Sequence, residues 1–349
     1  MGSARRMPRR IVALGGGTGL PVVLRGLRPY VTAGLSEELT AVVTVTDDGG
    51  SSGRLRRSMG LPPPGDIRNC LVALSEDEQL LSGLFQHRYG ASTEFEGHSV
   101  GNLILAALAE QTGCFLKAVE LSSRVLRTAG RILPATQANV SLEALLHDGS
   151  RIVGETSINA CGRTIERVFL RPEDAAPTPG VLEAIRDADL VVIGPGSLHT
   201  SLLPNLLVHG VARALAETPA VVVLVANLVR ERGEAAGLDL AGHLAAIEQH
   251  AGGPILDALI VHDGAIDPAV LARYEAEGAT PLTGPVDPEL RPHLVRRGLV
   301  APGWKLRHSP PETAEALIEA WSYLEPGRND RPAKRRGALG TEVGGESHR

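Results

Sequence analysis

Four glycines lie within five residues near the N-terminus, directly after a short apolar run. Residues 11–14 predict a buried strand, and residues 20–27 have helical spacing. A strand, a glycine turn and a helix in this order direct backbone N–H groups and the positive end of a helix dipole at one point, which favours a phosphate group there. A tight turn that needs positive φ explains one or two of the glycines but not four. The residues expected to bind nucleotide or phosphate are Gly16, Gly17, Thr18 and Gly19.

This turn does not match the common nucleotide-binding fingerprints. Leu20 or Val22 stands where the G-x-G-x-x-G pattern needs its third glycine, depending on the glycine from which the count begins. The next acidic residues, Asp47 and Asp48, lie further along than the usual ~20 residues. No Gly-Lys-Ser/Thr follows, which excludes a P-loop. The pattern therefore disfavours a nicotinamide oxidoreductase.

A second group of polar residues follows the next predicted strand, where ligands bind in open α/β sheets. One of its two carboxylates could accept a sugar hydroxyl, hold a metal ion or cap the following turn, and an Asx-turn loop is the simpler alternative. The pattern G-x-S-x-G around Ser51 matches the nucleophile elbow of hydrolases, but no oxyanion-hole glycine motif accompanies it. The candidate ligand-binding residues are Asp47, Asp48, Gly49, Gly50, Ser51 and Arg54.

Two further segments combine polar side chains with the predicted start of a helix. Asp66 is expected to cap one helix, with Arg68 and Asn69 facing outward at its N-terminus to meet phosphate or carboxylate. The alternative there is an ordinary cap with solvated neighbours. His98 opens the next helix as a general acid or base or as a hydrogen-bond donor, with Asn102 one turn further along. A structural role for His98 is the alternative.

The second half of the chain repeats the arrangement of strand, glycine turn and helix after the apolar residues 191–193. This repeat predicts a second anion site at the carboxyl end of a strand. Asn227 ends the following strand, where a base or ribose could contact it. His243 and His250 lie seven residues apart and are expected at the surface rather than in a zinc site. The residues of the second turn are Gly194, Pro195, Gly196 and Ser197.

The elements that must position these residues alternate between apolar runs and helical patterns. The alternation predicts an α/β fold with a Rossmann-like, doubly wound and mostly parallel sheet, because such strands are covered on both faces. The predicted strands span 11–14, 39–45, 190–193, 221–226 and 256–261. The predicted helices between them include 181–187, 202–216 and 240–250.

The middle of the chain departs from this alternation. It predicts a helical and antiparallel β insertion at about residues 66–172, inside one nucleotide-binding domain that spans 10–325. A last helix at 312–324 is expected to pack on the core, and disordered tails are expected at 1–9 and 326–349. The predicted helices of the insertion span 66–74, 77–87, 99–111 and 116–127. Its predicted antiparallel strands span 131–133, 139–145, 151–157 and 164–170.

Composition restricts the partners of this 349-residue chain. A net charge of −5 and an aromatic content of 3% provide neither the field nor the stacking platforms that nucleic acid needs. Three cysteines without a shared motif indicate reduced thiols. No apolar run reaches the ~18 residues of a membrane span, and the one near the N-terminus is too short for a signal peptide. The sequence predicts a cytoplasmic protein without nucleic-acid partners.

Five of these motifs, taken together, resemble the signature of the gluconeogenesis factor (YvcK-like) family. The order and spacing match from about residue 10 to about residue 324, with one departure after Asn227, where the family's Thr-Gln pair is missing. That family is similar in fold to the CofD-like 2-phospho-L-lactate transferases of coenzyme F420 synthesis. The motifs span residues 15–20, 46–54, 63–69, 97–102 and 194–197.

The resemblance implies a regulatory protein that binds a UDP-sugar such as UDP-N-acetylglucosamine. It also implies a role in cell shape and in peptidoglycan and envelope synthesis on gluconeogenic carbon sources. The alternative is a phospholactyl or phosphoryl transferase in which Asp47 or Asp48 holds Mg²⁺. The glycine motif of those transferases reads Gly-Val-Gly-Gly rather than the Gly-Gly-Thr-Gly of residues 16–19, which favours the regulator. No cofactor is expected with certainty, and a regulatory protein partner and a homodimer both stay open.

Overall fold

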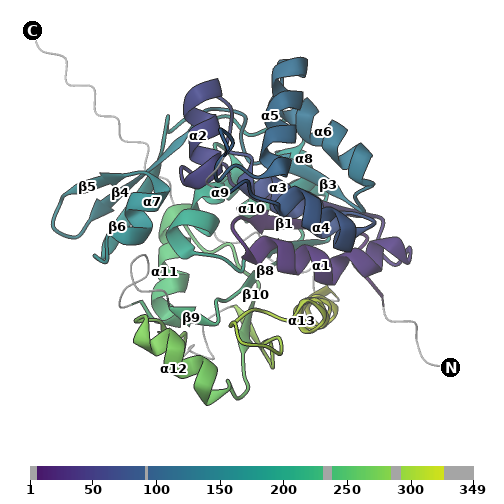
Figure 1. Ribbon diagram of the computed structural model, residues 1–349. Coiled ribbons are helices and arrows are strands. Elements are labelled where there is room, and N and C mark those ends of the chain that lie inside the picture. Colours follow the sequence, from purple (N-terminus) through teal and green to yellow (C-terminus); the bar gives the residue numbers. More distant parts are fainter. Residues whose placement is uncertain (1–5, 91–92, 231–237, 284–291, 326–349) are drawn as a thin grey trace, which may run out of the picture.

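The computed structural model describes residues 6–90, 93–230, 238–283 and 292–325. Its centre is a seven-stranded sheet in the order β12-β10-β8-β7-β1-β2-β3, in which all neighbouring strands are parallel. Helices flank this sheet (Figure 1), which confirms the predicted Rossmann-like α/β class. The strands are β1 (Arg10–Gly15), β2 (Glu38–Val43), β3 (Arg131–Pro134), β7 (Leu190–Ile193), β8 (Val221–Val225), β10 (Ala258–His262) and β12 (His293–Arg297).

The order of the strands reverses at β1. The chain adds β2 and then β3 on one side of β1, and later returns to place β7, β8, β10 and β12 on the other side. Ile11 of β1 pairs with Leu39 of β2 and with Leu190 of β7. Ligands of open α/β sheets bind outside the carboxyl ends of the strands at such a reversal. The two predicted glycine turns directly follow β1 and β7, so the topology places both of them there.

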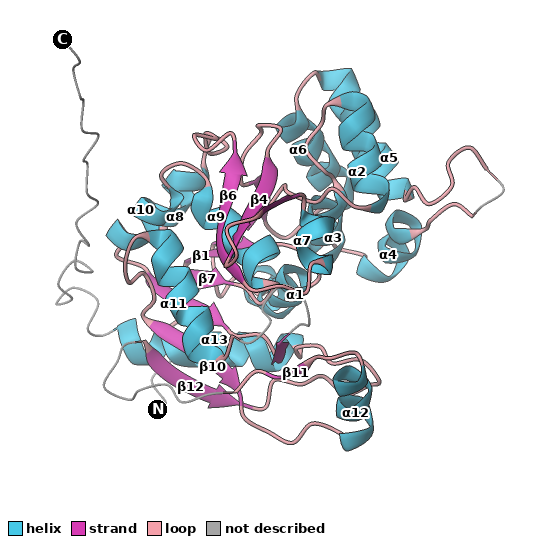
Figure 2. Cartoon of the chain, turned by 90° about the vertical axis from the view of Figure 1, so that its left-hand side faces the viewer, coloured by secondary structure: helices cyan, strands magenta, loops and turns pink. Residues whose placement is uncertain are grey.

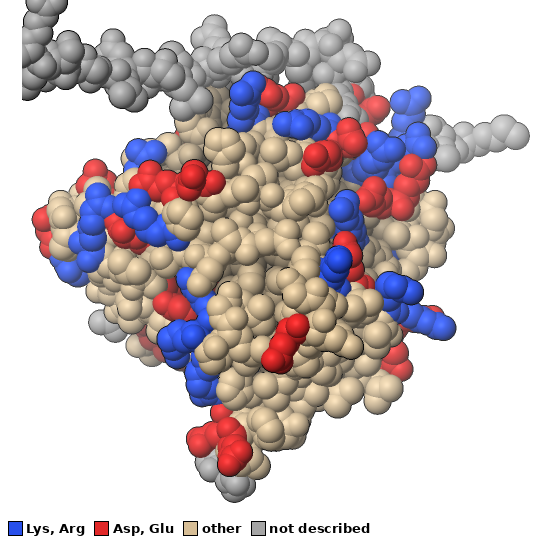
Figure 3. Space-filling model, turned by 90° about the horizontal axis from the view of Figure 1, so that it is seen from above, with Lys and Arg blue, Asp and Glu red and all other residues tan. Residues whose placement is uncertain are grey.

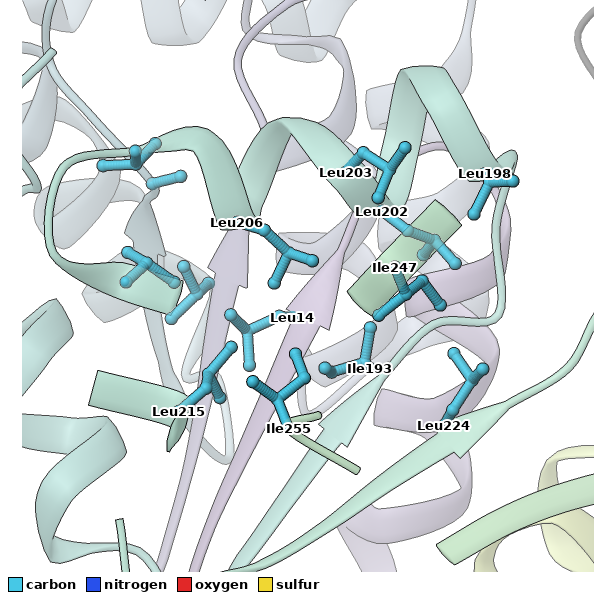
Figure 4. Packing of buried hydrophobic residues seen from close by; sticks show 14 of the residues in the cluster. Leu14, Ile193, Leu198, Leu202, Leu203, Leu206, Leu215, Leu224, Ile247 and Ile255 are labelled. Carbon is cyan, nitrogen blue, oxygen red and sulfur yellow. The ribbon is translucent and has the colours of Figure 1, made fainter. Parts of the chain in front are cut away.

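Successive side chains along the strands point to opposite faces of the sheet, and each face has its own hydrophobic core. Val12 and Leu14 belong to one core, whereas Ile11 and Ala13 belong to the other. Figure 4 shows Leu14 in the first core, below leucines of the segment that follows β7. The first core is closed by α8 (Val181–Asp187), α9 (Leu203–Leu207), α10 (Val211–Glu217) and α11 (Leu240–Ala251). The second is closed mainly by α1 (Gly19–Thr32), α3 (Gly65–Leu74) and α13 (Pro310–Leu324).

Between β2 and β3 the chain is helical. The four helices predicted there are confirmed, and a fifth, α2, precedes them, although the sequence gives its residues the character of a polar loop. Gly49 is the N-cap of α2 and Gly60, with a φ of 67°, ends it. Figures 1 and 2 show α2, α5 and α6 grouped at one end of the molecule. These helices are α2 (Gly50–Met59), α3, α4 (Glu78–Gln86), α5 (Val100–Thr112) and α6 (Phe115–Leu126).

The antiparallel part is a three-stranded sheet in the order β5-β4-β6, and two predictions about it were wrong. Residues 131–133 belong to β3, which pairs with β2 in parallel at the edge of the main sheet. The predicted strand at 151–157 stops early, because Gly154 has a φ of 98° and begins a helix. The elements are β4 (Ser141–Leu146), β5 (Arg151–Val153), α7 (Glu155–Ala160) and β6 (Ile165–Arg171).

The helix predicted at 202–216 is broken into pieces. Gly210, with a φ of 81°, starts α10 as a new helix after α9. A π-helical turn, η1 (Leu198–Leu202), precedes α9 directly after the second glycine turn. The predicted last helix is confirmed as α13, which packs against α1. The remaining elements are β9 (Val229–Arg230), β11 (Thr280–Pro281) and α12 (Pro268–Ala276).

His243 and His250 are buried on α11, so the prediction that they lie at the surface was wrong. His250 accepts a hydrogen bond from the backbone N–H of Val168 (3.1 Å) and donates one to the carbonyl of Ala246 (2.7 Å). Burial lowers the pKa of His243 to about 4. Helical periodicity places both residues on one face, and that face packs inward.

The described residues bear on the predictions about membrane spans and surface charge. No helix among them is long and apolar enough to cross a bilayer. Figure 3 shows one face of the molecule, on which Lys and Arg are interspersed with Asp and Glu, without a broad area of one sign. Of the predicted tails at 1–9 and 326–349, residues 1–5 and 326–349 lie outside the described residues. Residues 6–9 are described, and the N–H of Arg9 donates to Asp189 Oδ2 (2.9 Å), so the predicted tail was too long at its inner end.

Candidate functional site

The two glycine turns lie against each other at the carboxyl ends of β1 and β7. A Cβ on Gly19 would lie 2.0 Å from the carbonyl oxygen of Pro195, and a Cβ on Gly16 would lie 2.3 Å from Cγ2 of Thr44. Gly17 has a φ of 59°, which favours glycine for a separate reason. Packing around the first turn therefore requires glycine at positions 16 and 19.

A cavity of about 280 Å³ opens between the two turns. Arg25 of α1 lines one wall, and Arg307 lies on the segment that leads into α13. Among the described residues that line the cavity there is no Asp or Glu. The N-cap residue Thr18 makes no side-chain hydrogen bond to the first turn of α1. In that turn the N–H of Leu20 donates to the carbonyl of Gly16 (3.4 Å) and Pro21 has no N–H, which leaves the N–H of Gly19 for a ligand. The cavity is thus suited to an anion.

The predicted site residues fall into three groups. One group lines the cavity, one supports its walls, and one forms a separate polar cluster around α2 and α5. The cavity group is Gly17, Thr18, Gly19, Asn69, Pro195, Gly196, Ser197 and Asn227. The supporting group is Gly16, Asp66, Arg68 and Gly194. The polar cluster contains Asp47, Asp48, Gly49, Gly50, Ser51, Arg54, His98 and Asn102.

Asn227 fixes the second glycine turn. Its Oδ1 accepts a hydrogen bond from the N–H of Gly196 (3.0 Å), and its Nδ2 donates one to the carbonyl of the same residue (2.8 Å). The side chain thereby joins the end of β8 to the turn after β7. A contact between Asn227 and a base or ribose stays a prediction.

The sequence predicted Asp66 as the N-cap of α3, and this prediction was wrong. Pro64 is the N-cap, and Oδ2 of Asp66 accepts a hydrogen bond from the N–H of Gly17 (2.7 Å). Burial raises the pKa of Asp66 to about 6, and the nearby Asp47 adds to the rise, whereas the Gly17 N–H opposes it. A carboxyl group with this pKa, directly behind the first glycine turn, changes its charge close to physiological pH.

Arg68 points into the protein, so the prediction that it faces outward was wrong. Its side chain is buried, and its guanidinium donates to Ser99 Oγ (2.6 Å), Asn102 Oδ1 (3.0 Å) and Asn69 Oδ1 (2.9 Å). The bond to Asn69 occupies the amide oxygen of that residue. The group that Asn69 can offer to a ligand in the cavity is therefore its NH₂, a hydrogen-bond donor.

Replacing Arg68 with alanine should lower the free energy of unfolding by about 2 kcal/mol, because two buried acceptors and one half-buried acceptor lose a charged donor. Any loss of ligand affinity should be smaller, since Arg68 acts on the cavity only through Asn69. Urea denaturation of Arg68→Ala measures the first effect, with the exposed Arg57→Ala as the control. A variant of unchanged stability would contradict the buried network.

Ser51 and His98 are close enough to resemble a catalytic pair, but their hydrogen bonds argue against it. Arg54 Nε donates to His98 Nε2 (3.1 Å), so the proton of the neutral ring lies on Nδ1, 3.1 Å from Ser51 Oγ. Asn102 Nδ2 donates to the same oxygen (3.0 Å). Burial and Arg54 both lower the pKa of His98. Ser51 therefore accepts two hydrogen bonds and is not activated by a base, as a hydrolase would require.

Asp47 and Asp48 point to different partners. Oδ1 of Asp47 accepts from the N–H of Gly49 (2.9 Å), which is the Asx-turn alternative. Oδ1 of Asp48 accepts from the N–H (2.9 Å) and the hydroxyl (2.6 Å) of Thr156, at the start of α7. The described residues contain no group of three or more His, Cys, Asp or Glu placed to hold a metal ion. The carboxylate next to Asp47 in the site is that of Asp66.

The sequence analysis missed several residues that line the cavity. Arg25 lies three residues after Val22 and four after Pro21, which also line the cavity, so helical spacing could have placed it on the cavity face of α1. Gln86 and Arg307 carry no local signal, because only the tertiary fold brings α4 and the segment before α13 to this cavity. His308 also lines it and donates to the carbonyl of Ala226 (3.0 Å), and burial lowers its pKa to about 4. His308 is therefore neutral at pH 7.

The family assignment follows from the comparison with known proteins. A family model described as "2-phospho-L-lactate transferase CofD" matches residues 11–296. The chain belongs to the CofD family. Within it, the chain is 44% identical over 317 residues to the gluconeogenesis factor of Halalkalibacterium halodurans, covering 89% of this chain and 96% of that protein. It is 46% identical over 273 residues to the gluconeogenesis factor of Bacillus subtilis, covering 78% and 84%.

A solved structure from the same family supports the fold. The crystal structure of a UPF0052 family protein from Bacillus halodurans matches with a TM-score of 0.84 and 44% identity, covering 89% of this chain and 99% of that chain. The resemblance to the gluconeogenesis factors, first seen in five short motifs, is thereby confirmed over most of the CofD-type domain.

Proposed function

We propose that this protein binds a nucleotide sugar such as UDP-N-acetylglucosamine at the junction of its two glycine turns, without turning it over. The observation that carries the proposal is the composition of the cavity at the strand reversal, where Arg25, Arg307 and Gly19 at the start of α1 line the wall and no described lining residue is acidic. A diphosphate is the part of a nucleotide sugar that such a cavity favours.

The remaining lining residues have complementary roles in this proposal. Ser197 and Ser201 offer hydroxyl groups near the second turn, and Asn69 offers its NH₂ group to a phosphate oxygen or a sugar hydroxyl. A cavity of about 280 Å³ is at the lower end of the ~300–1,000 Å³ of small-molecule sites. The diphosphate and an adjoining ring would occupy it, and the rest of the ligand would extend beyond it.

We propose that this protein has the same biological role as its relatives. Two of them are named gluconeogenesis factor, and this chain covers 96% and 84% of their lengths. In our proposal the protein senses a nucleotide sugar that is a precursor of the cell envelope and passes the signal to a regulatory partner during growth on gluconeogenic carbon sources. Its setting would be the cytoplasm.

Titration calorimetry with UDP-N-acetylglucosamine, GDP and NAD tests the ligand. We expect binding of the UDP-sugar, and we expect Arg307→Ala to weaken it by about 2 kcal/mol, or roughly thirtyfold, because a charge-assisted hydrogen bond is lost. Arg213→Ala is the control, since its exposed guanidinium pairs only with Glu217 on α10 among the described residues. No binding at millimolar UDP-sugar, together with clear binding of NAD or GDP, would refute the proposal.

A transferase is the second candidate, because the matching family model is named after a 2-phospho-L-lactate transferase. Such an enzyme would use a nucleotide-activated substrate, and Mg²⁺ would neutralise charge on its phosphates. Mg²⁺ is often held by one or two carboxylates together with phosphate oxygens, and Asp47 and Asp66 are the carboxylates that would serve in that case. Asp48 fits less well, since its Oδ1 is engaged by α7.

A further inference from the structure

Arg25, which lines the cavity, forms an ion pair with the carboxylate of Glu78 on α4. Arg25 Nε donates to Glu78 Oε1, and the two side chains are only 32% and 23% exposed. A guanidinium carries five N–H donors in a planar fork. An acceptor on Nε fixes the plane of that fork, while the Nη groups stay available for an anion that enters the cavity.

Glu78 is itself held independently of Arg25. Arg28 Nη1 lies 3.2 Å from Glu78 Oε2, and the same nitrogen donates to the carbonyls of Ala73 (3.2 Å) and Ser75 (2.9 Å). The carboxylate is thus shared by two arginines, one of which is anchored to the end of α3. Arg28 compensates the negative charge of Glu78, which leaves the positive charge of Arg25 for a ligand.

The helix that carries Glu78 packs on the second core through the buried Phe85 and the partly buried Leu81. Among the side chains of α4, that of Phe85 is the buried one, and Leu80 and Leu84 are 69% and 50% exposed. Its last residue, Gln86, lines the cavity. The ion pairs of Glu78 therefore hold the first turn of α4, whereas the buried Phe85 holds the end next to Gln86.

We propose that Glu78 is a positioning residue for the ligand site, which holds the Arg25 guanidinium with its Nη groups toward the cavity. This inference rests on the proposed function, because it needs an anionic ligand between the glycine turns. A competing role, in which Glu78 occupies Arg25 and must be displaced by the ligand, makes the opposite prediction for affinity.

The test is the affinity for UDP-N-acetylglucosamine of Glu78→Ala and Glu78→Gln, measured by calorimetry below the unfolding transition. Glu78→Ala should weaken binding about three- to tenfold, because a flexible Arg25 must be ordered on binding. Glu78→Gln should bind as well as the wild type or better, since its amide oxygen still accepts from Nε. The matched control is Glu76→Ala, whose exposed carboxylate pairs with Arg127.

A double-mutant cycle separates positioning from a general loss of structure. In an Arg25→Ala background, Glu78→Ala should have no further effect on affinity, whereas an effect that persists there would overturn the proposal. Tighter binding by Glu78→Ala would identify Glu78 as a competitor and likewise overturn the proposal.

Inorganic pyrophosphate, used as a second probe, distinguishes the failure of this inference from that of the proposed function. A wild-type protein that binds pyrophosphate but not the UDP-sugar would refute the proposed function, and the same variants would then test Glu78 with pyrophosphate. A wild-type protein that binds neither probe would refute both.

Discussion

Replacing Gly19 with alanine should lower the free energy of unfolding by about 3 kcal/mol or more and abolish binding in the cavity. A Cβ at this position would lie 2.0 Å from the carbonyl oxygen and 2.6 Å from the carbonyl carbon of Pro195. Both contacts are to backbone, so no side-chain rotation can relieve them. The turns after β1 and β7 would have to separate, and the cavity lies between them.

The matched control is Gly83→Ala on α4. A Cβ on Gly83 meets no atom within 4 Å, and alanine is favoured over glycine inside a helix by up to about 1 kcal/mol. Urea denaturation and calorimetry with UDP-N-acetylglucosamine should therefore show a stable, binding-competent Gly83→Ala and a destabilised, inactive Gly19→Ala. A Gly19→Ala protein with normal stability and affinity would show that the two turns do not touch.

The sequence predicted well those features that depend on residues next to one another in the chain. The apolar runs that became β1, β7, β8 and β10 are buried on both faces of the sheet, and each can be seen in four to six neighbouring residues. The two glycine turns are also local patterns, and the topology brought them together at the strand reversal. Their pairing followed from a general rule about parallel sheets rather than from any residue in either turn.

The features that failed depend on partners far away in the chain. Asp66 looks like a helix cap, but its partner is the N–H of Gly17, 49 residues earlier. Arg68 looks solvated, but α5 supplies Ser99 and Asn102 to bind it. Arg307 carries no motif and reaches the cavity only because α13 packs against α1. Long-range contacts of this kind leave no periodic trace in the sequence.

The charge of Asp66 should control both stability and binding between pH 4 and pH 7. Burial raises its pKa in the folded protein to about 6, above the usual 3.8, so the folded state binds the proton more tightly than the unfolded state. The contribution of Asp66 to the free energy of unfolding is therefore greatest at low pH and decreases as the pH rises from about 4 to about 6. A shift of this size corresponds to about 3 kcal/mol.

Asp66→Asn removes the free-energy cost of ionising a buried carboxyl group. Its amide oxygen still accepts the hydrogen bond from the Gly17 N–H. The stability of the variant relative to the wild type should therefore increase by up to about 3 kcal/mol between pH 4 and pH 7, as measured by urea denaturation in a series of buffers. A difference between the two proteins that is constant with pH would contradict a raised pKa at Asp66.

The same carboxylate separates a regulator from a transferase. Without a metal ion, ionised Asp66 beside the phosphate turn repels a diphosphate, so UDP-N-acetylglucosamine should bind more weakly as the pH rises through 6 and should bind equally well in EDTA. With Mg²⁺ held by Asp47 and Asp66, binding should instead strengthen as the carboxylates ionise and should fail in EDTA.

We expect the first outcome, because both carboxylates already accept backbone N–H groups, Asp47 from Gly49 and Asp66 from Gly17. The decisive measurement is the affinity of wild type, Asp47→Asn and Asp66→Asn with and without EDTA, alongside an assay for released UMP or UDP. In the regulator both variants keep binding, within a few kcal/mol, and no product appears. Metal-dependent binding with product release, lost in both variants, would make the protein a transferase in which the phosphate turn and the two carboxylates form one catalytic site.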